Sequence, residues 1–533
     1  MKKLLIRILG LVLAGVVLAG CADVDRITGM LADLKYTTFG EMEYTRPDLD
    51  DLREAKDKAC QLAEGKDFDA LMDAIYEFND IYDAFYTNYS LADIHYCIDL
   101  TDLYWEEEYN YCLENSAAVD AILEDLYYTL AKSPSRKRLE GKTYFGPGFF
   151  DAYDGENQWD ETFLDLMEQE AALQSRYYKL SSEAASYEIG TEAYYDAYAP
   201  EMAQVLVDLV LLRQQIAAHW GYDDYVQFAT DFYYYRDYTP AQSAAYLEDI
   251  RRELVPLYRE YASSSNWAVE NEFCSQEDTY AYVRQMAQKM GSTFWEAFEL
   301  MDAADLYHIS YSPNKYNSSF EVYLESYSQP FIFMCPLQTS YDKLTFAHEF
   351  GHFCNDYASY GSYAGVDVAE VFSLGMEYLS LCYGSDRQDL AWLKMADGLS
   401  LFVEQAAFAA FEQQMYQLTG EELNVEGLQA LYGRTVAAYG FDAVLYDERE
   451  FVTIPHFYTN PMYIISYVVS NDAALQLYQM EQEEAGKGLA CYEENLDTQS
   501  TYFLEFIEDA GLTSPFEEGR VAQIRKTLEA ALG

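Results

Sequence analysis

Positively charged residues are scarce in this chain of 533 residues. It has 34 lysines and arginines against 91 aspartates and glutamates, which gives a formal net charge of -57 at pH 7. Such a surface repels the phosphates of nucleic acids and the headgroups of anionic lipids. We therefore expect no nucleic-acid partner, and among peptides we expect cationic ones to be attracted, weakly at physiological salt.

Proline and glycine are also sparse, with 12 and 28 residues. From about residue 48 onward, apolar residues recur at three- and four-residue spacing with acids between them, as in residues 48–65 and 68–89. This pattern predicts long amphipathic helices. Residues 318–337 differ, because β-branched and aromatic residues alternate or run together between turn formers. We expect a mainly α fold with a small β-sheet directly before residue 344.

Closely spaced cysteines are absent. Eight cysteines follow Cys21, and none of them forms a CxxC motif or a compact disulfide framework. We therefore expect mostly free, buried thiols, and one bridge between Cys97 and Cys112 stays open.

Long hydrophobic runs are missing except near the N-terminus. Residues 8–20 are uninterruptedly apolar, follow a basic start and precede Cys21. This is a secretory signal, too short to span a membrane as a mature helix. Its ending, "LAGC", resembles the bacterial lipobox, which implies cleavage before Cys21 and lipidation of that thiol. The alternatives are a plain signal peptide or a buried first helix.

The expected N-terminal organisation follows from this resemblance. Residues 1–20 would be the lipoprotein signal peptide and 21–47 a lipidated tether. The mature protein would be anchored through Cys21 to the outer face of the bacterial cytoplasmic membrane, on the extracellular or periplasmic side.

Histidine is scarce too, yet two of the six histidines lie four residues apart in "FAHEFGH". On a helix, His348 and His352 are about 40° apart and can bind one ion, with Glu349 beside them. Two imidazoles with an adjacent carboxylate are typical of a zinc peptidase. Gly351 would let another backbone or a substrate approach closely. The alternative is a helix with two chance histidines.

A second helical pattern, residues 366–381, offers a third ligand. Glu370 and Glu377 are seven residues apart, so they share a face, with Ser373 between them. One acid could bind the ion while the other orients a histidine through its free ring nitrogen. A solvated acidic face is the alternative, but the helix is otherwise apolar, and unpaired acids there would be costly.

A third segment, residues 453–470, concentrates polar groups that suit a site. It holds His456 together with Tyr458, Tyr463 and Tyr467. Tyrosine is so common in this chain, at 52 residues, that any one of these could be ordinary core packing. Histidine is not common, so His456 is the stronger sign of a site.

"FAHEFGH", "AEVFSLGME" and "IPHFYTNPMYIISY" together resemble the thimet oligopeptidase and oligoendopeptidase F family of zinc metallopeptidases. The resemblance covers roughly residues 200 to 530. It implies one Zn²⁺ per chain, bound by His348, His352 and Glu370, with Glu377 as the fallback ligand. Glu349 would be the catalytic carboxylate.

The resemblance also implies roles for the remaining candidates. His456 and Tyr467 would donate hydrogen bonds to the transition state, and Tyr463 would contact the substrate. We add Tyr458 as a candidate substrate contact. Glu377 and Ser373 would lie behind the ligands.

The fold implied is a two-lobed helical shell around a deep substrate channel, with a helical lobe at 48–200 and a catalytic domain at 201–533. The function implied is hydrolysis of internal bonds in short unfolded peptides, by a metal-activated water with Glu349 as general base. We expect a monomer. A dipeptide-releasing exopeptidase with the same site, and a non-catalytic peptide-binding lipoprotein, remain open as alternatives.

Overall fold

The computed structural model describes residues 36–142, 144–184, 187–262, 273–361, 364–385, 387–441, 447–498 and 500–532. The predicted signal peptide and the predicted lipidation site Cys21 lie outside these residues. Within the described part of the chain, no helix is long and apolar enough to cross a membrane.

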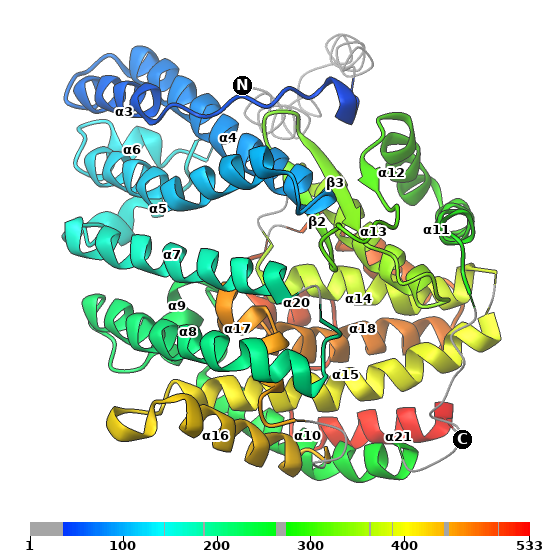
Figure 1. The fold of residues 1–533 in the computed structure, drawn as a ribbon. Helices are drawn as coiled ribbons and strands as arrows, with labels where there is room; N and C mark the ends of the chain where they lie inside the picture. Colours follow the sequence, from blue (N-terminus) through cyan, green and yellow to red (C-terminus); the bar gives the residue numbers. More distant parts are fainter. Residues whose placement is uncertain are drawn as a thin grey trace.

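The N-terminal half is a stack of helices in which each long helix contacts the next (Figure 1). Aspartates begin several of them: the side chain of Asp48 accepts a hydrogen bond from the first turn of α3, and Asp102 does the same for α5. Such caps satisfy helical N–H groups that have no partner within the helix. The elements of this half are η1 Phe39–Glu41, α3 Leu49–Ala63, α4 Phe68–Ile98, α5 Leu103–Ala131, α6 Arg136–Leu139, η2 Phe149–Tyr153, α7 Glu161–Ala184 and α8 Glu192–His219.

A three-stranded sheet is formed within residues 307–334, in the order β1-β3-β2. Its strands are β1 Tyr307–His308, β2 Ser319–Leu324 and β3 Gln329–Met334. β2 and β3 pair antiparallel, with Glu321 opposite Ile332, and β1 pairs parallel to β3. Every residue of the central strand β3 is buried. The prediction of strands at 318–337 is confirmed, whereas β1 was missed because two residues carry no readable pattern.

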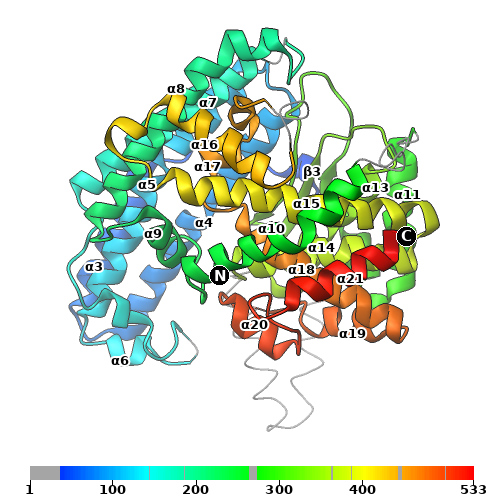
Figure 2. The ribbon, with the colours of Figure 1, turned by 90° about the horizontal axis from the view of Figure 1, so that it is seen from below.

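The other helices form the second half of the molecule, and among them α13 packs on strands β2 and β3. Helix α14 is buried along most of its length and contacts α13 on one side and α18 on the other. Helices α10, α15 and α21 contact one another beneath them (Figure 2). These elements are α9 Tyr225–Phe232, α10 Pro240–Ala262, α11 Gln276–Met290, α12 Ser292–Ala303, α13 Asp342–Ser359, α14 Val366–Tyr383, α15 Arg387–Met415, η4 Gly420–Glu422, α16 Val425–Ala438, η5 Glu450–Thr453, α17 His456–Thr459, α18 Ile465–Glu483, α19 Lys487–Glu494, α20 Phe503–Asp509 and α21 Arg520–Leu532.

The hydrophobic core has one large cluster, a smaller one under α3, α4 and α5, and a third that consists of Ala92, Tyr96 and Tyr109. Helices α7 and α8 contribute to the large cluster, together with the C-terminal helices. The predicted boundary at residue 200 falls inside α8, which continues through Pro200. The two predicted lobes therefore share this helix.

None of the eight cysteines after Cys21, all within the described ranges, forms a disulfide, as the spacing predicted for most of them; four are buried and four are partly buried. The bridge left open between Cys97 and Cys112 is not formed. Cys97 instead donates a hydrogen bond to Asp93 at 3.4 Å and lies in the large core cluster, whereas Cys112 is packed in the smaller one.

Candidate metal centre

Helix α13 is fixed at its start to the loop that leaves β3. The buried carboxylate of Asp342 accepts hydrogen bonds from the backbone N–H groups of Leu337 at 2.8 Å and Gln338 at 2.7 Å. The helix also packs against β2 and β3. The sheet thus sets the position of the helix that carries both predicted histidine ligands.

Helices α13 and α14 approach each other at Gly351. A Cβ atom at this position would lie 2.6 Å from the carbonyl oxygen of Phe372 and 2.7 Å from the Cα of Ser373. Real Cβ atoms do not come that close to backbone, so only glycine fits. The close approach expected at Gly351 is therefore made by the backbone of α14.

This approach brings His348, His352 and Glu370 together. Their ligand atoms all lie within 4.8 Å of one another. The Nε2 atoms of His348 and His352 are 3.5 and 3.8 Å from the Oε2 atom of Glu370. Ligands bound about 2 Å from a tetrahedral zinc ion are about 3.4 Å apart, so the two nitrogens and the carboxylate oxygen fit such an ion.

Glu370 is nearly inaccessible, and both of its oxygens accept hydrogen bonds. Tyr463 donates to Oε1 at 2.6 Å and Ser373 donates to Oε2 at 2.8 Å. These two hydroxyls hold the carboxylate towards the histidines. Ser373 lies behind the carboxylate as expected, but Tyr463 contacts Glu370, a role that the sequence did not suggest.

The other acid of α14, Glu377, lies behind His348. Its Oε1 atom is 2.7 Å from Nδ1 of His348, so the Nδ1–H donates to it and Nε2 is left for an ion. Its Oε2 atom is 2.7 Å from Nζ of Lys394 on α15, whose side chain is fully buried. Burial alone would raise the pKa of Glu377, but Lys394 and His348 hold it below its usual range.

The two histidines differ electrostatically. Burial lowers the pKa of His352 well below its usual value, so its imidazole is neutral, the form that binds metal. Burial also acts to lower the pKa of His348, but the hydrogen bond with Glu377 and the charge of Glu370 outweigh this and raise it to about 9. A metal ion binding at His348 must therefore displace a proton.

Glu349 lies next to His348 but is not part of the ligand cluster. Only 5% of its surface is exposed. Burial is the main reason that its pKa is raised to about 8; the charge of His348 opposes the shift, and Glu370 adds to it. A carboxylate whose affinity for a proton is raised in this way suits proton transfer near neutral pH.

His456 and Tyr467 approach the cluster from α17 and α18. Nε2 of His456 and the hydroxyl of Tyr467 are 3.2 Å apart. Burial raises the pKa of Tyr467, and the charges of Glu370 and Glu349 raise it further, so its hydroxyl keeps its proton and can donate it to a hydrogen bond. Burial lowers the pKa of His456, so its ring is neutral.

Tyr458 is the candidate that the structure places elsewhere. It is 0% exposed, its ring stacks on Tyr177 at 3.7 Å between centroids, and its hydroxyl donates to the carbonyl of Met202 at 3.2 Å. A side chain enclosed in this way cannot touch a substrate. The prediction for Tyr458 is wrong, and the tyrosine is part of the core.

Helices α14 and α18 are joined by a buried polar cluster next to the ligands. Asp367 lies one turn before Glu370 and accepts hydrogen bonds from Arg236 at 3.2 Å and from Tyr238 at 2.7 Å. Ser466 of α18 also donates to Asp367. This cluster fixes the helix of Glu370 against the helix of Tyr467.

Two contacts near the site were not predicted from the sequence: that of Lys394 with Glu377 and that of Arg236 with Asp367. Both residues contribute from segments outside the three motifs. The single sign of Lys394 in the sequence is a lone lysine in the apolar stretch "LAWLKMA". Arg236 gives no comparable sign, because its partner Asp367 is 131 residues away.

A pocket of about 400 Å³ opens beside the cluster. One wall comes from α5 and α7, and the other from residues 459–463 and the start of α14. Tyr463, whose hydroxyl binds Glu370, is part of the wall. The lining is mostly apolar or aromatic, with Met167, Tyr233 and Tyr234 among its members.

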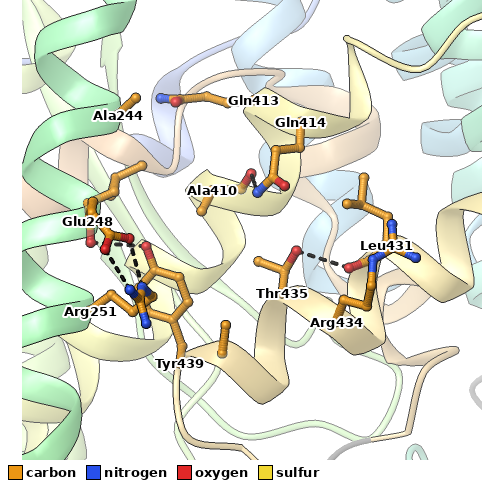
Figure 3. Close-up of a pocket in the computed structure, with 12 residues that line it drawn as sticks. Ala244, Glu248, Arg251, Ala410, Gln413, Gln414, Leu431, Arg434, Thr435 and Tyr439 are labelled. Carbon is orange, nitrogen blue, oxygen red and sulfur yellow. Dashed lines mark hydrogen bonds and ion pairs between the residues drawn. The ribbon is translucent and has the colours of Figure 1, made fainter.

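A second hollow of about 400 Å³ lies between α10, α15 and α16 (Figure 3). Two of its three charged residues, Glu248 and Arg251, form an ion pair with each other, and the third is Arg434. The hydroxyls of Thr435 and Tyr439 donate to the backbone carbonyls of Leu431 and Leu247. The ion pair and the two hydroxyls are already partnered, so the hollow offers less chemistry than the histidine cluster.

Comparisons with known proteins bear on the family and on the fold. Residues 39–171 match the peptidase M3 N-terminal domain family. A search of curated proteins found no match.

Several solved structures share the whole fold. PZ peptidase A, solved with an inhibitor, has a TM-score of 0.82 and 20% identity over 93% of this chain and 99% of that chain. A candidate oligoendopeptidase F has a TM-score of 0.81 and 22% identity, over 93% of this chain and 98% of that chain. A candidate oligoendopeptidase F from Bacillus anthracis strain Ames has a TM-score of 0.78 and 21% identity, over 93% of this chain and 98% of that chain.

At these identities the likeness establishes the fold, and the family match covers the N-terminal part. The chain therefore has the fold of the oligoendopeptidase F structures, its residues 39–171 match the M3 N-terminal domain, and the resemblance predicted from its motifs is confirmed.

Proposed function

We propose that this chain is a zinc-dependent oligopeptidase that hydrolyses internal bonds of short unfolded peptides. The observation that carries the proposal is the position of Glu349, buried beside three converging ligand atoms of His348, His352 and Glu370. A protein that only binds peptides has no need of a carboxylate at that place.

His348, His352 and Glu370 would hold the ion. When bound there, zinc would polarise a water molecule and the carbonyl of the scissile bond. Glu349 takes a proton from the attacking water and delivers it to the departing amine. Tyr467 and His456 donate hydrogen bonds to the oxygen on which negative charge develops.

The pocket beside Tyr463 would hold a substrate side chain. Its aromatic and aliphatic lining favours an apolar residue of the peptide. Because the pocket lies between α5 and α7 on one side and the start of α14 on the other, a bound peptide would touch both halves of the molecule.

The decisive experiment combines metal analysis with product analysis. Purified protein should contain one zinc per chain and cleave quenched peptides that are blocked at both ends, and a chelator should abolish cleavage. Mass spectrometry of the products should show internal cleavage. Release of dipeptides alone would favour the exopeptidase, and zinc-free protein without hydrolysis would leave a binding protein.

We also propose that the mature chain is exported and anchored through a lipid on Cys21, and that it acts on oligopeptides as a monomer. The basic start, the apolar run 8–20 and "LAGC" support the anchor. Replacing Cys21 by alanine should move the protein from the membrane fraction to the soluble exported fraction. An unchanged distribution would refute the anchor.

A further inference from the structure

We propose that Lys394 is a positioning residue of the metal centre: it holds Glu377 in the orientation that presents His348 to zinc and so sets the affinity for the ion. The inference rests on the proposed function, because it assumes that His348 is a ligand. It adds a residue from a third helix, α15, which none of the sequence motifs includes.

The geometry places the three groups in a row. Nζ of Lys394 is 2.7 Å from Oε2 of Glu377, and Oε1 of the same carboxylate is 2.7 Å from Nδ1 of His348. Each oxygen of Glu377 thus has one partner, the ammonium group on one side and the imidazole on the other. The carboxylate can rotate only by losing one of them.

Lys394 itself is held in place on two further sides. Its side chain is 0% exposed, and Nζ is 3.0 Å from Oδ2 of Asp397 and 4.7 Å from the centre of the Tyr378 ring. Asp397 in turn accepts a hydrogen bond from the hydroxyl of Tyr341 at 2.8 Å. Tyr341 directly precedes α13, so the network connects α13, α14 and α15.

Because Glu377 is buried, its carboxylate depends on Lys394. An unpaired carboxylate in the interior is strongly unfavourable, so Glu377 needs a cation nearby. Lys394 supplies the charge from the side opposite to His348. Without it, the Oε2 atom of Glu377 would be left without that partner, and the carboxylate would turn away from His348 or the helices would shift. Either change weakens the second layer of contacts that orients a metal-binding histidine.

A purely structural lysine would behave differently. Its loss would lower stability and disturb the site to the same degree whether or not Glu377 is charged. A lysine that acts through Glu377 loses its effect once Glu377 has been altered. A double-mutant cycle separates these two cases.

The test is the zinc dissociation constant of the full chain, measured by competition with a chromophoric chelator. The proteins are wild type, Lys394→Met, Glu377→Gln and the double variant. We expect Lys394→Met to weaken binding about 10- to 100-fold, the range seen when second-layer partners of metal ligands are removed. The double variant should bind zinc no more weakly than Glu377→Gln.

Arg520→Met is the matched control. Arg520 forms a buried ion pair with Asp472, between α21 and α18. Its loss should lower the melting temperature and leave zinc affinity unchanged. Should Lys394→Met fail to fold, Asp397→Asn loosens Lys394 from one side and should weaken zinc binding several-fold.

Unchanged zinc affinity in Lys394→Met, or in Asp397→Asn where that variant stands in for it, would overturn the inference. An equal loss in the wild-type and Glu377→Gln backgrounds would overturn it too. These outcomes leave the proposed function standing, whereas wild-type protein that binds no zinc would refute that function itself.

Discussion

Glu349 is the residue on which the proposed chemistry depends. The helix of the two histidines places it beside the ligand cluster, and burial raises its pKa to about 8. The same burial limits the contact of Glu349 with bulk water. A substitution that keeps its shape and removes its charge therefore tests its role directly.

Glu349→Gln should lower kcat by about 10²- to 10⁴-fold, the usual contribution of general acid-base catalysis. Zinc content should stay at the wild-type level, because Glu349 is not part of the cluster of ligand atoms. Parallel assays and metal analysis check both statements. As a control, replacing the exposed Glu529 by glutamine should change neither kcat nor zinc content. Undiminished hydrolysis by Glu349→Gln would show that Glu349 is not the general base.

The two tyrosines Tyr467 and Tyr458 should respond in opposite ways to loss of the hydroxyl. Tyr467→Phe should lower kcat about 10²-fold or more, because a donor to the developing charge is lost. Tyr458→Phe should keep wild-type kcat/KM and lose about 1 kcal/mol of stability, since its hydroxyl bonds only to the core carbonyl of Met202. Steady-state kinetics and urea unfolding measure the two effects, and a kinetic defect in Tyr458→Phe would contradict the assignment of this tyrosine to the core.

Glu412 of α15 should make stability depend on pH. Its carboxyl is fully buried and accepts the backbone N–H of Met462 at 2.7 Å. Burial raises its pKa to about 8, above the 4.5 of an exposed glutamate. Between these values the folded state holds a proton that the unfolded state releases, so this contribution to stability is complete below pH 4.5 and falls as pH rises to 8.

Glu412→Gln cannot ionise, so it should gain stability relative to wild type as the pH rises. The gain should be about 2 kcal/mol or more between pH 5 and 8. Urea unfolding of both proteins at the two pH values provides the comparison. A constant difference between them would show that Glu412 does not titrate in this range.

Sequence reasoning at this scale found residues whose spacing carries information. His348 and His352 could be paired because four residues separate them on one helix, and Glu370 with Glu377 because seven do. Tyr458 could not be told from Tyr463 and Tyr467, since only packing decides which ring faces the site. Lys394 was out of reach, because its partner lies on another helix.

At the scale of elements, the close contact of α13 and α14 sets the distance between the histidines and Glu370. Gly351 is the point of contact. Gly351→Ala should push α14 away, because the new methyl group would meet its backbone. We expect a loss of about 1–3 kcal/mol in stability and weaker zinc binding.

Gly433 of α16 is the matched control. A Cβ atom there would meet only Cβ of Glu448, at an ordinary 3.5 Å. Gly433→Ala should be neutral or slightly stabilising, because alanine favours the helix. Melting temperatures and zinc titrations of both variants check the prediction. Wild-type zinc affinity in Gly351→Ala would show that the helix contact does not control the site.

Most elements could be predicted because their patterns are local. The helices 342–359 and 366–383 follow helical patterns in the sequence, and the strand pair 319–334 follows its β-branched and aromatic residues. The order β1-β3-β2 and the fit of α14 between α13 and α18 depend on contacts between distant segments. No single segment of the sequence contains that information.

At the scale of the whole molecule, the excess of acidic residues should favour the binding of cationic peptides. A net charge of -57 attracts cationic peptides over a distance that salt shortens to about 10 Å at 0.1 M. A peptide with two lysines should therefore have a higher kcat/KM than its glutamine analogue at low salt. The ratio should fall towards one at about 0.5 M salt. A ratio that does not change with salt would contradict this view.

Only part of the division of the chain into lobes could be predicted from the sequence. The helical N-terminal stack and the helices around the sheet were both expected, but the boundary proposed at residue 200 falls inside α8. Because α8 is a continuous helix, no linker of different composition marks a domain boundary in the sequence there. The core therefore crosses the boundary that the resemblance implied.

X-ray absorption at the zinc edge of the purified, zinc-loaded chain tests the central claim most directly. Our account predicts one zinc per chain with two imidazole nitrogens and oxygen ligands at about 2.0–2.1 Å, and loss of the imidazole signal in His348→Ala. Sulfur ligands from the free cysteines, or a zinc spectrum unchanged in His348→Ala, would contradict it.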